Sequence, residues 1–179
     1  KGADYTVSCA GLLVSRTQAM AGRKTAPSSS GRQAERSQLR IIGGRWRGRR
    51  IEFSARPGLR PTPDRVRETL FNWLQPGLPG SRCLDLFCGS GALAMEALSR
   101  GAAAATLVDL SPAVLREIRR NLDRLGATDV ELLAADALEW LRTVRDRHYD
   151  IVFIDPPFGS GAATRCLQLL ATCGLAAPG

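Results

Sequence analysis

The stretch Cys83-Leu84-Asp85-Leu86-Phe87-Cys88-Gly89-Ser90-Gly91-Ala92-Leu93 decides the fold class of this chain. An apolar run stops at a Gly-Ser-Gly turn and continues into a helix-like segment that reaches Arg100. A buried parallel strand, a tight loop and a helix form the opening of a nucleotide-binding βαβ unit. Gly89 and Gly91 have no Cβ, so the backbone can turn sharply and come close to a ligand. The helix N-terminus behind the loop favours a ligand that carries an anionic group.

The chain beyond Arg82 alternates apolar runs with helix-like segments. Strands are predicted at 82–87, 104–109, 129–134 and 150–154. Helices are expected at 91–100, from Ser111 to a C-cap at Gly126, at 137–146 and at 161–173. This alternation predicts an α/β fold with a doubly wound, mainly parallel sheet and right-handed crossovers.

Taken alone, the glycine loop leaves two cofactor classes open. It also satisfies the G-x-G-x-x-G/A pattern of NAD-binding folds, with Asp109 at about the expected distance. Two features favour a different cofactor. Asp85 lies inside the strand, where its carboxylate can point into the cleft, and Asp155-Pro156-Pro157-Phe158 closes the strand at 150–154. An NAD oxidoreductase has no obvious use for that tetrapeptide.

These motifs resemble the S-adenosylmethionine-dependent methyltransferases that modify exocyclic amino groups, whose pattern is Asp/Asn/Ser-Pro-Pro-aromatic. The chain is still more similar to the bacterial RsmD-type enzymes, which methylate guanine N2 in 16S ribosomal RNA. The matching segments are 40–49, Leu59–Thr62, 64–74, the glycine loop and Asp155–Phe158. The resemblance runs from about Leu39 to about Leu175, and the block 64–74 is its most specific part. It implies a Rossmann-like class I methyltransferase that acts on the 16S RNA or on the small-subunit particle.

S-adenosylmethionine is the cofactor that the resemblance implies. The residues predicted to bind it are Arg60, Thr62, Asp85, Gly89, Ser90, Gly91, Asp109, Leu110, Asp136 and Ala137. Asp109 can accept both ribose hydroxyls, as the acid after strand two does in Rossmann sites. Asp136 is placed for the adenine edge but could equally cap the helix at 137–146. Arg60 could pair with the methionine carboxylate, with phosphate binding or a solvated charge as the alternatives.

The predicted catalytic residues are Asp155, Pro156, Pro157 and Phe158. An exocyclic guanine amine is a weak nucleophile because its lone pair is delocalised into the ring. Asp155 and the Pro156 carbonyl can accept the two amine hydrogens, and prolines keep this frame stiff because their rings fix φ. Phe158 can stack on the base, which must leave its helix or loop to arrive.

Charge is distributed unevenly along the chain. Residues 1–60 carry 13 Lys or Arg against 3 Asp or Glu, whereas residues 61–179 carry 12 against 14. A basic section on a near-neutral body indicates a polyanion partner. Alternating apolar and basic residues within 39–60 predict a two-stranded hairpin that contacts RNA. The predicted contact residues are Arg45, Trp46, Arg47, Arg49 and Arg50, with Trp46 available to stack a base.

Two further arginines lie on the helix predicted at 63–74, for which Thr62 is the expected N-cap. We place Val66, Leu70, Trp73 and Leu74 on its apolar stripe. Arg65 and Arg67 then fall on the polar side, where they could extend the RNA surface. Salt bridges with Asp64 and Glu68 are the alternative interpretation.

The domain organisation follows from composition and from the resemblance. Residues 1–38 are expected to form a disordered tail, of which 1–19 are extraneous if Met20 is the native start. Residues 39–60 form the basic hairpin extension, and 61–179 form the methyltransferase domain. The methyltransferase sheet usually has seven strands, so we expect a fragment truncated after the fourth strand and its helix. The fourth strand would then be an exposed edge.

Other classes are less well supported by the sequence. The five cysteines include no C-x-x-C pair and accompany one histidine, so we expect no metal site. The longest apolar run near the N-terminus is too short to span a membrane. We expect a cytoplasmic monomer. A DNA adenine or cytosine amino-methyltransferase and a non-catalytic RNA-binding module on a Rossmann scaffold remain the alternatives.

Overall fold

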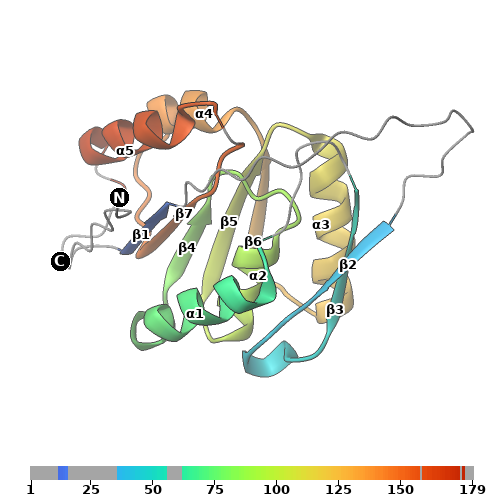
Figure 1. The fold of residues 1–179 in the computed structure, drawn as a ribbon. Coiled ribbons are helices and arrows are strands. Elements are labelled where there is room, and N and C mark those ends of the chain that lie inside the picture. The colour runs from blue at the N-terminus through green and yellow to red at the C-terminus, as the bar shows by residue number, and fades with distance from the viewer. Residues whose placement is uncertain (1–11, 16–35, 56–61, 158, 174, 176–179) are drawn as a thin grey trace, which may run out of the picture.

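A computed structural model describes residues 12–15, 36–55, 62–157, 159–173 and 175, with side chains from Arg36 onward. Its centre is a five-stranded parallel sheet with the order β1-β7-β4-β5-β6 (Figure 1). The strands are β1 (Leu12–Ser15), β4 (Arg82–Asp85), β5 (Ala104–Asp109), β6 (Val130–Ala134) and β7 (Ile151–Ile154). The doubly wound, Rossmann-like α/β prediction is confirmed.

Helices cover both faces of this sheet, which explains why its strands read as nearly continuous apolar runs. The helices are α1 (Asp64–Leu74), α2 (Ala92–Ser99), α3 (Pro112–Leu125), α4 (Ala137–Thr143) and α5 (Ala162–Cys173). One core cluster joins α1, α2 and α3 to the face that carries Phe153. The other joins α4 and α5 to the face that carries Ile154. Among the described residues, no helix has both the length and the apolar character needed to cross a membrane.

The predicted hairpin is present as an antiparallel pair, β2 (Arg36–Arg40) and β3 (Arg50–Ser54), connected through a short 3-10 helix at Gly44–Trp46. Its inward side chains, including Ile51 and Phe53, belong to the same core cluster as α1, α2 and α3. Trp46 is also part of this cluster and only 6% exposed. The expectation that Trp46 stacks on a base is therefore wrong for this arrangement, because its ring is a core side chain.

Two expectations about the sheet edge are corrected by β1. Leu12–Ser15 pairs in parallel with all of β7, from Leu12 opposite Ile151 to Ser15 opposite Ile154. These four residues are thus a strand rather than tail, and they cover the edge of β7 that we expected to be exposed. An unpaired strand edge presents a row of N–H and C=O groups that a short β-forming segment such as Leu-Leu-Val can satisfy. Residues 36–38 of the predicted tail are also wrongly assigned, because they belong to strand β2. The rest of the predicted tail up to residue 35 lies outside the described residues.

The helix ends show how local sequence sets the boundaries. Ser111 caps α3 by accepting a hydrogen bond from the Val114 N–H at 3.4 Å, and Gly126 ends the helix with φ +69°. At α1 the cap position falls on Pro63 and the helix begins at Asp64. The N-cap prediction for Thr62 is therefore wrong by one residue, which leaves its hydroxyl available for another contact.

Candidate active site

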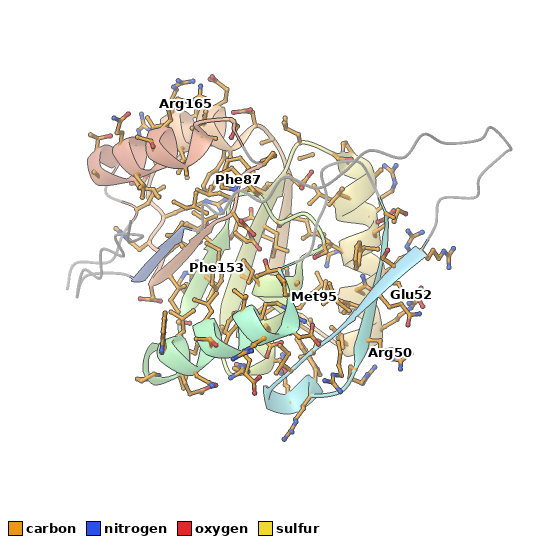
Figure 2. The ribbon with its side chains drawn as sticks, viewed as in Figure 1. Arg50, Glu52, Phe87, Met95, Phe153 and Arg165 are labelled. Carbon is orange, nitrogen blue, oxygen red and sulfur yellow. The ribbon has the colours of Figure 1, made fainter. Side chains whose placement is uncertain are left out.

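Three acidic side chains meet where the central strands end. Asp85 is the last residue of β4, Asp109 is the last of β5, and Asp155 follows β7 directly. Since these strands are parallel, their carboxyl ends share one edge of the sheet. Burial raises the pKa of Asp85, and the charges of Asp155 and Asp109 add to that rise. Figure 2 labels Phe87, which follows β4, at this edge.

The glycine loop makes the tight turn that the sequence predicts. The Gly91 N–H donates to the Cys88 carbonyl at 2.6 Å, and φ is +49° at Gly89 and +73° at Gly91. A Cβ at Gly91 would come within 3.1 Å of the Met95 methyl group and 3.2 Å of the Ile118 side chain. Larger residues would thus strain the turn and crowd the core beneath it.

Asp109 ties this loop to the start of α3. Its Oδ2 accepts from the Gly89 N–H at 3.1 Å, and its Oδ1 accepts from the Ser111 N–H at 2.8 Å. The carboxylate is therefore fixed in position, and each of its oxygens still has a lone pair for a ligand hydroxyl. The adjacent Leu110 is 71% exposed and offers an apolar surface beside it.

Asp85 is a buried carboxyl group whose pKa is raised by its surroundings. Its side chain is 2% exposed, and within the described part of the chain its Oδ1 has no hydrogen-bond partner. Burial raises the pKa of Asp85 to about 7, and the charge of Asp155 adds to that rise, while the backbone N–H groups of Phe87 and Ala94 oppose it. A buried acceptor without a donor is rare in proteins, and a ligand that brings a cation or donors would satisfy it.

Asp136 has the capping role that we kept as its alternative. Its Oδ1 accepts from the Leu138 N–H at 2.9 Å and from the Glu139 N–H at 3.0 Å, so it caps α4. Asp136 and Ala137 follow β6, which ends at Ala134. A contact of either residue with adenine stays a prediction.

The predicted reaction tetrapeptide follows β7, with Asp155 exposed, Pro156 half-buried and Pro157 exposed. The Thr62 hydroxyl donates to Asp155 Oδ2 at 3.2 Å. The segment before α1 thus reaches the strand ends, as expected if Thr62 belongs to the site. Phe158 and Arg60 lie outside the described residues.

A buried charge cluster behind the site was not predicted. Arg67 and Glu96 are both 0% exposed, and Arg67 Nη1 lies 3.4 Å from Glu96 Oε2. Arg67 Nη2 also forms an ion pair with Asp64 Oδ1 at 2.7 Å. The Arg67 guanidinium donates to the carbonyls of Thr62 at 3.2 Å and Arg40 at 2.8 Å. The expectation that Arg67 extends an RNA surface is therefore wrong, whereas the alternative of a salt bridge with Asp64 is confirmed. The buried stripe of α1 is Arg67, Leu70, Phe71 and Leu74, and Trp73 is exposed.

Glu96 connects this cluster to the hairpin. Its carboxylate accepts from the Ile42 N–H at 2.9 Å and from the Gly43 N–H at 2.8 Å, and it pairs with Arg100 at 2.8 Å. No periodicity signals this role, because a single Glu among the apolar residues of α2 looks like an exposed position. Three segments distant in sequence meet at one carboxylate.

The hairpin arginines differ in their surroundings. Arg45 lies over the Trp46 ring, with its guanidinium carbon 4.2 Å from the ring centroid. Arg49 donates to the Arg124 carbonyl at the end of α3 at 2.6 Å. All four arginines predicted to contact RNA, Arg45, Arg47, Arg49 and Arg50, are exposed. A contact of any of them with a phosphate stays a prediction.

Comparison with known proteins places the chain in a family. The family described as "Conserved hypothetical protein 95" matches residues 39–179. Ribosomal RNA small subunit methyltransferase D of Escherichia coli K12 is 50% identical over 133 residues, which is 74% of this chain and 67% of that protein. The chain belongs to this methyltransferase family. The protein of the same name from Haemophilus influenzae is 43% identical over 138 residues, which is 75% of this chain and 72% of that protein.

Solved structures agree with this membership in the methyltransferase D family. A putative methyltransferase, yhhF from Escherichia coli, has a TM-score of 0.71 and 44% identity, covering 79% of this chain and 76% of its own. The more distant Trm5b from Pyrococcus abyssi, at 17% identity and a TM-score of 0.58, shares the fold. All predicted site residues lie inside the range that the family matches, whereas β1 lies before it.

Proposed function

We propose that this chain transfers a methyl group from S-adenosylmethionine to the exocyclic N2 amine of a guanine in the 16S RNA of the small ribosomal subunit. The relatives that carry the name ribosomal RNA small subunit methyltransferase D support ribosomal RNA as the substrate class. The observation that carries the proposal is the position of Asp155-Pro156-Pro157. This segment directly follows β7. Asp155 accepts a hydrogen bond from the Thr62 hydroxyl, and its charge adds to the rise that burial causes in the pKa of Asp85.

The residues at the strand ends suit this cofactor. The unpaired Oδ1 of Asp85 is a buried acceptor that suits a cationic ligand, and S-adenosylmethionine carries both an ammonium and a sulfonium. Asp109 is fixed by two backbone N–H groups and suits the ribose hydroxyls, with the apolar surface of Leu110 beside it. We assign Asp136 and Ala137 to the adenine edge. When bound, the cofactor supplies an electrophilic methyl group that needs no further activation.

The chain's own task is to bind and orient the amine. Asp155 and the Pro156 carbonyl present acceptors to its two hydrogens, which moves the nitrogen towards tetrahedral geometry as it attacks. The Thr62 hydroxyl limits rotation of the Asp155 carboxylate, and two prolines limit the backbone behind it. Catalysis then rests on positioning and on exclusion of water.

Incubation with labelled S-adenosylmethionine and small-subunit RNA tests this proposal. Deproteinised RNA and assembled particles are compared, the RNA is digested, and the labelled nucleoside is identified. We expect N2-methylguanosine in at least one of the two substrates. Label on adenine or cytosine of duplex DNA would instead favour the DNA amino-methyltransferase. Absence of transfer to every substrate, with the cofactor bound, would favour the non-catalytic RNA-binding module.

A further inference from the structure

The hairpin and α3 form one rigid unit. Asn121 on α3 accepts from the Glu52 N–H at 3.1 Å and donates to the Glu52 carbonyl at 2.7 Å. Glu117 on α3 accepts from the Ser54 N–H at 3.0 Å and from the Ser54 hydroxyl at 2.6 Å. Side chains of α3 thereby satisfy the backbone along the edge of β3. The outer surfaces of the two elements therefore keep a fixed relative position.

This unit is rich in arginine. β2, β3 and α3 together contain seven arginines against three acidic residues. Strand alternation directs Leu39, Ile51 and Phe53 inward and leaves Arg36 exposed on the other side. On α3, Arg116, Arg120 and Arg124 are four residues apart and form one exposed stripe. Arg36, Arg120 and Arg124 line the same surface pocket between the hairpin and α3, which joins the two sets.

Two of the three acids of the unit, Glu52 and Glu117, are already paired or hydrogen-bonded, and the third, Asp123, is exposed on α3. Glu52 pairs with Arg124 at 3.2 Å and lies 3.8 Å from Arg36, and Glu117 binds Ser54 as described. Within the described part of the chain, the side chains of Arg116, Arg119 and Arg120 form no hydrogen bond or ion pair. These guanidinium groups therefore present their donors to solvent, where each planar fork can donate two parallel hydrogen bonds to the oxygens of a phosphate.

The exposed surface of α3 begins beside the strand-end site and extends away from it. The tip of the hairpin, in contrast, lies far from that site. α3 follows Ser111, whose N–H is held by Asp109, and its 14 residues span about 20 Å. The tip instead packs at the far end of α2, where the Trp46 N–H donates to Ser99 at 2.9 Å. Since α2 starts at the glycine loop, Ser99 marks the end remote from the site. Figure 1 shows the hairpin running along α3 from the lower edge of the sheet.

We propose that the surface formed by Arg36, Arg116, Arg119 and Arg120, here called the hairpin–α3 surface, binds phosphates of the RNA that flanks the reacting guanine. This inference rests on the proposed function, and it gives the hairpin tip a smaller part in RNA binding than the sequence predicts. Electrostatic contacts with phosphates fix the register of a nucleic acid without reading its sequence.

The test compares charge-matched triple variants. R36Q/R116Q/R120Q removes three positive charges from the hairpin–α3 surface, and R142Q/R145Q/R165Q removes three near α4 and on α5, across the sheet (Figure 2 labels Arg165). Affinity for deproteinised small-subunit RNA is measured from low to high salt. The slope of log K against log salt should fall in magnitude by about 2 to 3 units in the first variant and stay unchanged in the second. R36K/R116K/R120K should keep the wild-type slope.

Folding and methylation separate the possible failures. Circular dichroism melts should match wild type in all three variants, because every substituted residue is exposed. If both glutamine variants have the same slope of log K against log salt, while the wild-type protein methylates RNA, this inference is overturned and the proposed function stands. A wild type that neither binds nor methylates the RNA would overturn the proposed function. Loss of binding only to assembled particles would show that the surface meets a protein, which also overturns the inference.

Discussion

Replacing Arg67 by Met tests whether the buried charge cluster organises the region behind the site. Arg67 is fully buried and contacts two carboxylates, Asp64 and Glu96, and two backbone carbonyls, those of Thr62 and Arg40. Met fills most of the volume but carries no charge and no donor. Removing one partner of a buried pair typically costs 3–5 kcal/mol, because the other charge stays buried. Arg100 and two backbone N–H groups still hold Glu96, so we expect about 3 kcal/mol.

Urea unfolding measures this free energy from the shift in midpoint at constant m-value. Arg65→Met, on the same helix but exposed, is the matched control and should change stability by less than about 0.5 kcal/mol. The double variant Arg67→Met/Glu96→Gln should recover part of the loss, since it removes the stranded charge. A midpoint for Arg67→Met equal to that of Arg65→Met would show that the cluster contributes nothing to stability, and the argument would fail.

The remaining predictions concern two carboxylates of the site. Burial raises the pKa of Asp85 to about 7 in the folded chain, whereas an aspartate in an unfolded chain has a pKa of about 4. Between these two pH values Asp85 is protonated in the folded chain and ionised in the unfolded chain. Stability should therefore fall from about pH 4 to 7, by at most on the order of 4 kcal/mol, and Asp85→Asn should remove this slope in melts. A cationic cofactor prefers ionised Asp85, so calorimetric affinity for S-adenosylmethionine should rise from pH 6 to 8 in wild type; an identical rise in Asp85→Asn would refute the pairing. Asp155→Ala should cut single-turnover methylation by about 100-fold with a small change in cofactor affinity, and Asp155→Asn should retain more activity. Wild-type rates in Asp155→Ala would remove Asp155 from the chemistry.

The sheet could be predicted because its determinants are local. Strands buried on both faces appear as apolar runs, and caps such as Ser111 and Gly126 mark the ends of the helix between them. Parallel strands place all their carboxyl ends at one edge, so Asp85, Asp109 and Asp155 could be grouped without knowing any contact.

The buried charges and the sheet edge could not be predicted in the same way. A pattern of polar and apolar residues assumes that an arginine faces water, and Arg67 violates this because its partners come from distant segments. Trp46 misleads for the opposite reason, since an aromatic residue between arginines is typical of RNA contact but here fills the core. β1 depends on pairing with β7, more than 130 residues away in sequence, which no local signal encodes.

The buried pair of Arg67 and Glu96 has a consequence for positioning. A well-packed apolar pair in the same place is often at least as stable, so stability alone does not explain an ion pair there. Charges with several directional partners do fix relative position: Arg67 holds the backbone beside Thr62, and Glu96 holds the hairpin at Ile42 and Gly43. The pair therefore sets the distance between the hairpin and the residue that contacts Asp155. For a reaction that depends on placing an RNA base, a displacement of about 1 Å can cost roughly 100-fold in rate. Under the proposed function, the cluster would keep a fixed distance between the hairpin–α3 surface and the amine bound at Asp155.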